Sequence, residues 1–153
     1  MEPSEDKEQI ESGADAGTAV VEGLNAQVAG SLWEALGQRF EEASPDRVVM
    51  TMPVGPAAKQ PLGVLHGGAT VALAESAASV GTWLGVDHDT HDVYGLEINC
   101  NHLRTKREGM LRAVATPLHR GRRNWVWDIR VYDERESLIA VARCTVAVVA
   151  RQE

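Results

Sequence analysis

The residues best suited to chemistry lie in one stretch, QPLGVLHGGATVALAES, at positions 60–76. A single carboxylate, Glu75, stands in a segment made mostly of Ala, Ser, Gly and Val. A carboxylate buried there without partners is costly to ionise, so its position needs a reason. Small neighbours let a ligand or another backbone approach closely, and Glu75 could then act as a base or a nucleophile. The alternative is a carboxylate on the solvent side of an amphipathic helix.

Ser79 and the pair Gly67-Gly68 supply the other chemistry in this segment. Ser79 follows Glu75 by four residues, so the two share one helix face, where the hydroxyl could orient a water or hold the carboxylate. Two glycines at a helix start leave backbone N–H groups open to close approach, and the helix dipole favours negative charge there. Such N–H groups could polarise a carbonyl and stabilise its oxyanion. The alternative is that the glycines only make a tight turn into the helix.

The spacing between Gly67 and Glu75 bears on the assembly. Eight residues of helix span roughly 12 Å, whereas groups that act on one carbonyl must come within about 3 Å of it. One chain cannot place both groups on the same carbonyl, but two helices lying antiparallel across a two-fold axis can. We therefore expect at least a dimer, with active sites shared between subunits.

The hydrophobic pattern predicts the elements that position these residues. A helix is expected from about residue 67 to 84, and a shorter one within 24–40, where Leu32, Trp33 and Leu36 cluster. Strands are expected at 46–54, 93–104, 110–119, 124–133 and 137–150. The turns between the last strands are too short for parallel crossovers, so the sheet should be antiparallel. The predicted fold class is α+β, with one long apolar helix covered by one antiparallel sheet.

Two strand details follow from residue types. Pro117 has no backbone N–H, so it indicates a bulge or an edge position. One face of the strand at 124–133 alternates with polar residues and should be buried; its members are Trp125, Trp127, Ile129 and Val131.

Composition and charge indicate the domain organisation. The 153 residues are 44% hydrophobic and 24% charged, which fits one globular domain. The net charge of −7 argues against a general nucleic-acid binder. The first 25 residues carry seven acidic residues against one Lys. We expect an acidic disordered tail at 1–25 and one folded domain at 26–153.

Targeting, thiol and metal chemistry are not indicated. There is no run of 18 apolar residues and no basic region before one, so we expect no membrane span, no signal peptide and a cytoplasmic location. Cys100 and Cys144 lack a CxxC spacing, which favours two reduced core thiols. The segment DHDTHD at 87–92 mixes His with Asp, but in so polar a loop a solvated connector is favoured over a metal site. We expect no metal and no cofactor.

The ordered set Gln, HGG, Glu and Ser, followed by GLEINCNHLR, PLHRGRRNWVWDI and VYDE, resembles the hotdog-fold acyl-CoA thioesterases of the phenylacetate-type and aryl-CoA branch. The likeness covers about residues 48–149. It implies a hotdog fold, in which an antiparallel sheet wraps a long central helix. It also implies an acyl-CoA substrate, and a homodimer or homotetramer in which dimers share a continuous sheet.

The resemblance implies a role for each matching residue. Glu75 would be the catalytic carboxylate, acting as nucleophile or as general base on water. Gly67 would polarise the thioester carbonyl through its backbone N–H. The side-chain amide of Gln60 would lie near the thioester with His66 beside it, and Ser79 would position the hydrolytic water.

Coenzyme A brings phosphates, which need cations. The resemblance places the segment of His102 and Arg104, and the tip of Arg122 and Arg123, beside the nucleotide. At this tip the chain departs from the family, because it has Gly-Arg-Arg-Asn-Trp where the family tends to have Gly-Ser-Arg-His-Gln before Val-Trp. Solvated loops are the alternative for these cations.

The resemblance favours an aromatic acyl group. It favours 1,4-dihydroxy-2-naphthoyl-CoA, and hence menaquinone or phylloquinone synthesis; proofreading of aryl carrier proteins and hydrolysis of 4-hydroxybenzoyl-CoA are alternatives. The small residues Ala72, Ser76 and Ala78 leave space beside the helix, although aliphatic acyl groups also fit. A different class of function is a non-catalytic acyl- or ligand-binding hotdog protein in which Glu75 is structural. The joint presence of the residues with assigned roles favours the hydrolase.

Overall fold

The computed structural model describes the backbone of residues 5–151 and the side chains of residues 16–151. Its helices are α1 (Glu5–Ala26), α2 (Leu32–Leu36) and α3 (Gly67–Leu84), with a 3-10 turn, η1 (Pro56–Ala58). Its strands are β1 (Arg39–Ala43), β2 (Val48–Pro53), β3 (His91–His102), β4 (Met110–Arg120), β5 (Asn124–Asp133) and β6 (Leu138–Ala150).

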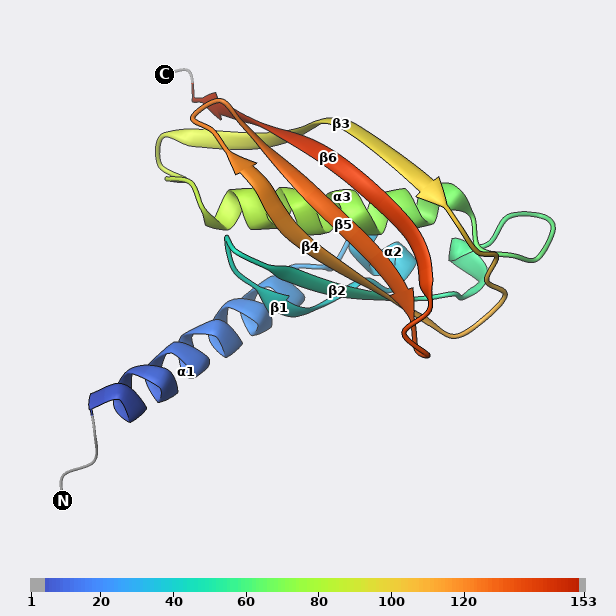
Figure 1. Ribbon diagram of the computed structural model, residues 1–153, viewed down its shortest axis with the longest axis horizontal. Coiled ribbons are helices and arrows are strands. Elements are labelled where there is room, and N and C mark those ends of the chain that lie inside the picture. The colour runs from blue at the N-terminus through green and yellow to red at the C-terminus, as the bar shows by residue number, and fades with distance from the viewer. Residues whose placement is uncertain (1–4, 152–153) are drawn as a thin grey trace.

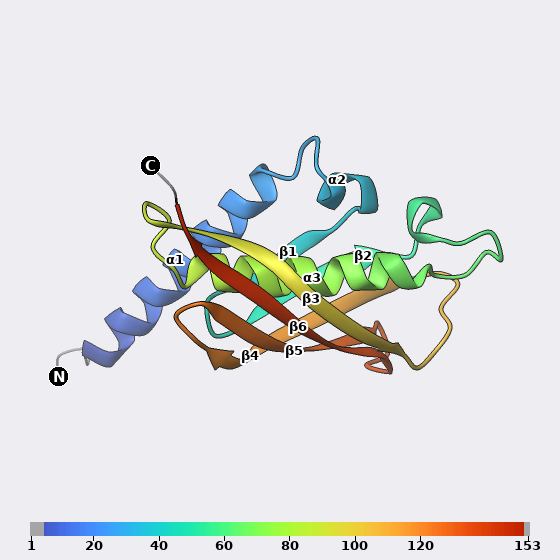
Figure 2. The same cartoon turned by 90° about the horizontal axis from the view of Figure 1, so that it is seen from above.

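The strands form one antiparallel sheet in the order β1-β2-β4-β5-β6-β3, and the sheet curls around α3 (Figure 1). Seen from above, β3 crosses α3 diagonally at one edge of the sheet (Figure 2). This arrangement confirms the predicted α+β hotdog fold. None of the helices in residues 5–151 is long and apolar enough to cross a membrane.

The core lies between α3 and the inner face of the sheet. The predicted face of β5, with its two tryptophans, is buried there. A side chain at Gly81 of α3 would overlap the ring of Trp127, so glycine lets the indole pack against the helix backbone. Trp127 Nε1–H then donates to Thr82 Oγ1 at 2.9 Å. The small residues on the inward side of α3 therefore serve packing.

The predicted elements agree with the structure for the central helix, whose bounds match, and for five strands, whose ends move by at most two residues. The predicted bulge is confirmed by a register shift between Pro117 and His119. Of the helix expected within 24–40, α2 covers only five residues. Strand β1 was not predicted, because its sequence, RFEEA, is polar and buries only Phe40 and Ala43.

Residues 5–26 form α1, where the sequence predicted a disordered tail over residues 1–25; residues 1–4 lie outside the described part of the chain. The end of α1 is tied to the sheet, because Asn25 Oδ1 accepts from the N–H of Phe40 at 2.9 Å and its Nδ2 donates to the carbonyl of Phe40 at 2.9 Å. Leu24 is buried in the core. Tertiary contacts at one end thus outweigh the acidic composition, and the folded unit begins before residue 26.

Candidate active site

The start of α3 is fixed by His66. This residue is extended (φ −79°, ψ 129°), and its Nδ1 accepts a hydrogen bond from the N–H of Gly68 at 2.8 Å. Among the described residues, the N–H of Gly67 has no hydrogen-bond partner. It is therefore a free donor at the positive end of an 18-residue helix.

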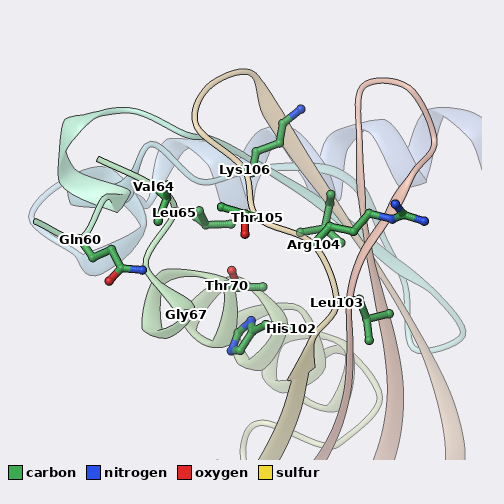
Figure 3. Close-up of a pocket in the computed structure, with 11 residues that line it drawn as sticks. Gln60, Val64, Leu65, Gly67, Thr70, His102, Leu103, Arg104, Thr105 and Lys106 are labelled. Carbon is green, nitrogen blue, oxygen red and sulfur yellow. The ribbon is translucent and has the colours of Figure 1, made fainter. Parts of the chain in front are cut away.

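A cavity of about 270 Å³ opens at this helix start. We call it the polar cavity; it is lined by Gln60, Val64, Leu65, Gly67, Thr70, Ile139 and residues 102–106. Figure 3 shows Gln60 and His102 on either side of Gly67, with the amide nitrogen of Gln60 directed toward the start of α3. The cavity thus combines a free backbone donor, an amide and an imidazole.

His102, the last residue of β3, lies directly against Gly67. A Cβ at Gly67 would lie 2.8 Å from His102 Nε2, so only glycine leaves room for the ring in this position. The other ring nitrogen, Nδ1, is 3.9 Å from Cys100 Sγ. The imidazole is therefore held between Cys100 and the first turn of α3.

Lys106 fixes the wall of the polar cavity rather than offering a charge to it. Its carbonyl accepts from the N–H of Leu65 at 2.8 Å, which joins the two loops around the cavity. Its Nζ donates to Glu134 at 2.8 Å and to Asp133 at 3.3 Å. The bond to Glu134 stabilises the charged amine and so raises the pKa of Lys106. Figure 3 shows this side chain directed away from the cavity. Arg104 is exposed and has no ion pair among the described residues, so it remains available to an anion.

Glu75 lies midway along α3, half-buried, with its carboxylate against β3. A Cβ at Gly95 would overlap Glu75 Oε1, so Gly95 provides the space that the carboxylate occupies. Ser79 is half-buried one turn further along. Sequence reasoning did not identify Gly95, although a glycine inside a strand can indicate close approach of another group.

Arg122 and Arg123 lie far from the polar cavity within one chain. They form the β4–β5 turn, where Arg122 and His91 line a cavity of about 390 Å³, and both arginines and His91 line one of about 470 Å³. This turn is beside the C-terminal end of α3, because Trp125 contacts Gly85. A helix of 18 residues spans roughly 27 Å. One chain therefore brings together Gln60, Gly67, His102 and Arg104, but not the two arginines of the turn.

Thr70 is a residue of the polar cavity that sequence reasoning missed. It is fully buried, and its hydroxyl has no hydrogen-bond partner. A helical Thr commonly bonds the carbonyl four residues before it, as Thr82 does to Ala78 at 3.0 Å. Figure 3 shows the Thr70 hydroxyl directed toward the segment of Thr105 instead. No sequence signal distinguishes these two threonines.

The two cysteines are unsuited to nucleophilic chemistry. Burial, with smaller contributions from Glu75 and Glu97, raises the pKa of Cys144 to about 12, and burial also raises the pKa of Cys100. Only the thiolate is a strong nucleophile. Both thiols are free and protonated at neutral pH, so neither cysteine is a candidate nucleophile.

Comparisons with known proteins show the family of this chain. A family model described as the thioesterase superfamily matches residues 62–140. The 1,4-dihydroxy-2-naphthoyl-CoA hydrolase of Escherichia coli strain K12 is 46% identical over 128 residues, which are 84% of this chain and 93% of that protein. The proofreading thioesterase EntH of Cronobacter turicensis is 40% identical over the same shares of the two chains.

A solved structure gives the same assignment. The crystal structure of a mutant thioesterase PA1618 from Pseudomonas aeruginosa superposes with a TM-score of 0.83 at 43% identity, covering 86% of this chain and 94% of that one. The chain therefore belongs to the thioesterase superfamily, with its hotdog fold, and is an enzyme of the thioester-hydrolase class.

Proposed function

We propose that this enzyme hydrolyses an aromatic acyl-CoA thioester, with Glu75 as the catalytic carboxylate and the N–H of Gly67 as the oxyanion donor. One observation carries this proposal: a half-buried carboxylate held against Gly95 and an unpaired N–H at the start of the same helix. A non-catalytic binding protein has no need for a carboxylate held against the backbone of β3 or for an unpaired N–H beside the ring of His102.

The two groups meet if two copies pair through β3. Within one chain, His102 lies at Gly67 and Gly95 lies at Glu75, so β3 runs antiparallel to α3. A two-fold axis that brings Gly67 opposite Glu75 of a second copy passes α3 at residue 71, midway between these two positions. The midpoint between 95 and 102 on β3 is at 98–99, so the same axis would pair the two β3 strands at their free edges.

Exposed apolar side chains support this pairing. Tyr94 and Leu96 of β3 are 59% and 67% exposed in the single chain, and such side chains on an edge strand are typical of an interface. The pairing makes a homodimer with two shared sites, and two such dimers would make the homotetramer expected from the family.

The proposed reaction follows from charge development at the carbonyl. The Gly67 N–H and the α3 dipole stabilise the oxyanion as the carbonyl carbon becomes tetrahedral. As a general base, Glu75 of the second copy takes a proton from water while the water oxygen bonds to that carbon; the carbon–sulfur bond then breaks, and the proton passes to the sulfur. As a nucleophile, a Glu75 carboxylate oxygen bonds to that carbon, and the carbon–sulfur bond breaks to release the thiolate and leave an anhydride. Water then cleaves the anhydride, which frees the acid, regenerates the Glu75 carboxylate and supplies the proton that the thiolate takes up. Ser79 positions the water in either route.

Gln60, His66 and His102 assist at the carbonyl end. The Gln60 amide and the His102 ring flank the Gly67 N–H, where they orient the thioester. His66 acts through the helix start, because its ring accepts from Gly68 and so leaves the Gly67 N–H as the free donor.

The phosphates of coenzyme A are proposed to bind cations from two copies. Arg104 lies at the polar cavity of one chain. A two-fold rotation about residue 71 places Gly85 of the second copy roughly 15 Å past Gly67, on the N-terminal side of α3. The Arg122–Arg123 turn of the second copy lies at the same end of the site. The turn that is remote within one chain therefore lies on the cavity side of the dimer.

The substrate we favour is 1,4-dihydroxy-2-naphthoyl-CoA, which assigns the enzyme to menaquinone or phylloquinone synthesis in the cytoplasm. The support is the Escherichia coli relative named for this activity. Proofreading of aryl carrier proteins is the second candidate, because a relative at 40% identity is named a proofreading thioesterase. A panel of naphthoyl-CoA, 4-hydroxybenzoyl-CoA, hexanoyl-CoA and an aryl carrier protein thioester ranks these candidates by kcat/KM.

Glu75→Gln tests the catalytic assignment. We expect a loss of about 10²- to 10⁴-fold in kcat with unchanged thermal unfolding, measured by release of free thiol. Glu41→Gln, an exposed position on β1, is the matched control and should retain full activity. A Glu75→Gln enzyme as fast as the wild type would refute the proposal.

Mixing two inactive variants tests the shared site. Glu75→Gln and Gly67→Val chains, unfolded and refolded together, should regain up to a quarter of wild-type activity, because half of the chains form heterodimers with one intact site in two. Each variant refolded alone should stay inactive. No recovery in a mixture shown to contain heterodimers would contradict a site built from two copies.

A further inference from the structure

A second cavity lies on the other side of the α3 start from the polar cavity. It has a volume of about 280 Å³ and is lined by Leu32, Leu36, Ala57, Lys59, His66, Gly68, Ala69 and Ala72. The polar cavity reaches α3 at Gly67 and Thr70, whereas this one reaches it at Gly68, Ala69 and Ala72. The first turn of α3 therefore separates two cavities of nearly equal size; we call the second one the α2 pocket.

The α2 pocket is mostly apolar, with Lys59 and His66 as its polar side chains, because of how α2 is attached. Trp33 anchors this short helix, since its Nε1–H donates to Ser76 Oγ at 3.0 Å and its ring packs edge-on against Phe40 at 5.1 Å between centroids. Leu32 and Leu36 are four residues apart and so share another face of α2, which lines the pocket. Leu32 is 58% exposed, which is unusual for a large apolar side chain at the mouth of a cavity.

Small residues make the floor of the α2 pocket. Ala57 comes from η1, and Ala69 and Ala72 come from α3. A larger side chain at Ala57 or Ala72 would fill part of the 280 Å³ without meeting the core of the sheet, because Ala57 is exposed and Ala72 is half-buried. The open volume of the α2 pocket therefore depends on the small side chains at these two positions, because the same fold could hold larger ones.

The two cavities match the two arms of a thioester. The carbonyl carbon bears the sulfur, with its pantetheine chain, and the acyl group, and these two substituents diverge from it. With the carbonyl oxygen at the Gly67 N–H, one arm passes to each side of the first turn. An amide, an imidazole and a guanidinium in the polar cavity suit the amide groups and phosphates of the thiol arm. Pockets for drug-sized ligands begin at about 300 Å³, so the α2 pocket has room for an acyl group and the polar cavity for the part of the pantetheine chain next to the sulfur.

We propose that the α2 pocket binds the acyl group of the thioester, and that Leu32, Leu36, Ala57 and Ala72 determine which apolar acyl groups the enzyme accepts. This inference rests on the proposed hydrolase function and extends it to a named acyl site. The acyl arm is apolar and of limited size, aromatic or a medium-length chain, and acetyl leaves most of the pocket unfilled.

The test compares variants that fill or enlarge the pocket. Ala57→Leu and Ala72→Leu should lower kcat/KM for naphthoyl-CoA by about 10- to 100-fold relative to acetyl-CoA. The reason is that a hydrophobic pocket discriminates by about this factor between acyl groups that differ in size by a methylene group. Leu32→Ala should shift the preference toward larger acyl groups. Ala35→Leu, at an exposed position of the same helix, is the matched control and should leave the ratio unchanged.

A binding measurement separates this inference from the proposed reaction. Phenacyl-CoA, a ketone that cannot be hydrolysed, should bind the wild type more tightly than CoA alone by calorimetry, and Ala57→Leu should remove most of that difference. If the wild type binds phenacyl-CoA in this way but hydrolyses no thioester, the function fails and the pocket stands. If the wild type is active and folded pocket variants keep its acyl preference, the pocket assignment is overturned. A change of oligomeric mass in Ala57→Leu, with acyl preference unchanged, would show that a second copy fills the pocket instead.

Discussion

The two ends of α3 use the same residue type for opposite purposes. At the N-terminal end, the nearest groups to Gly67 and Gly68 are the rings of His102 and His66, and a cavity opens on each side. At the C-terminal end, the nearest groups to Gly81 and Gly85 are the indoles of Trp127 and Trp125. At the N-terminal end, glycine leaves space for a ligand and polar groups. At the C-terminal end, large apolar rings fill the space that glycine leaves.

This difference teaches that small residues in an apolar helix do not by themselves mark a site. What separates the ends is whether the neighbouring side chains use up the space. An indole fills it and adds dispersion contacts, whereas an imidazole beside a free N–H leaves a donor that a substrate can reach. Substitutions at the two ends should therefore affect different properties, activity at the N-terminal end and stability at the C-terminal end.

The largest effect on activity is expected at Gly95, outside α3 but facing its middle. Gly95→Ala should displace the Glu75 carboxylate, because the added Cβ would overlap Oε1. We expect kcat/KM to fall by about 10²- to 10⁴-fold, as for loss of the base itself, while thermal unfolding changes little. Tyr94→Ala, its exposed neighbour, separates this effect from damage to the β3 edge. Full activity in Gly95→Ala would show that the carboxylate can work from another position.

A pair of substitutions at the two ends of α3 tests the comparison directly. Gly81→Ala should lower the free energy of unfolding by about 1–3 kcal/mol, because Trp127 must move in a close-packed core. Gly67→Ala should change stability by less than about 0.5 kcal/mol, since it meets the exposed ring of His102. It should nevertheless lower kcat/KM by about 10- to 100-fold by moving that ring. Denaturant unfolding and steady-state kinetics on both variants test this difference. A loss of stability in Gly67→Ala together with a loss of activity in Gly81→Ala would contradict it.

A smaller effect is expected at the arginine turn beside the C-terminal end. Replacing Arg122 and Arg123 by Gln should raise KM for acyl-CoA about 3- to 10-fold, because charge-assisted hydrogen bonds to phosphate are lost. A truncated thioester without the nucleotide should not be affected, and Arg39→Gln, on β1, serves as the control. Equal effects on both substrates would mean that the turn contributes only to packing at that end.

The smallest effect concerns acid stability near the polar cavity. The N–H of Ser137, followed by that of Arg135 and by Lys106, holds the pKa of Asp133 below its usual value. The contribution of Asp133 to stability is therefore complete above about pH 4 and is lost as pH falls through the lowered pKa. Asp133→Asn should lower the melting temperature at pH 7 by a few degrees and should flatten the decline of the melting temperature as pH falls below about 4. A decline as steep as that of the wild type would assign it to other carboxylates.

Much of the fold was predictable because its signals are local. The bounds of α3 follow from apolar continuity after the His-Gly-Gly turn, and β5 follows from alternation. The signals failed where distant contacts decide. Strand β1 is formed by pairing with β2 despite a polar sequence, and the end of α1 is held by Asn25 against Phe40.

The candidate site divides in the same way. Sequence reasoning proposed Gly67 and Glu75 from one continuous stretch, and the family resemblance added Gln60. It could not identify Gly95 or Thr70, because their importance comes from the groups packed against them, a carboxylate in one case and no hydrogen-bond partner in the other.

The sequence alone was enough to predict the central helix and five of the antiparallel strands and to propose the reactive groups, because residue type and periodicity act over a few neighbouring positions. Only the tertiary structure decided which glycines face imidazoles and which face indoles. The tertiary structure also places one cavity on each side of the first turn of α3, and it places the arginine turn at the opposite end of α3 from His102. The physical reason is that space and proximity depend on side chains brought together from separate elements, and one-dimensional spacing does not record them.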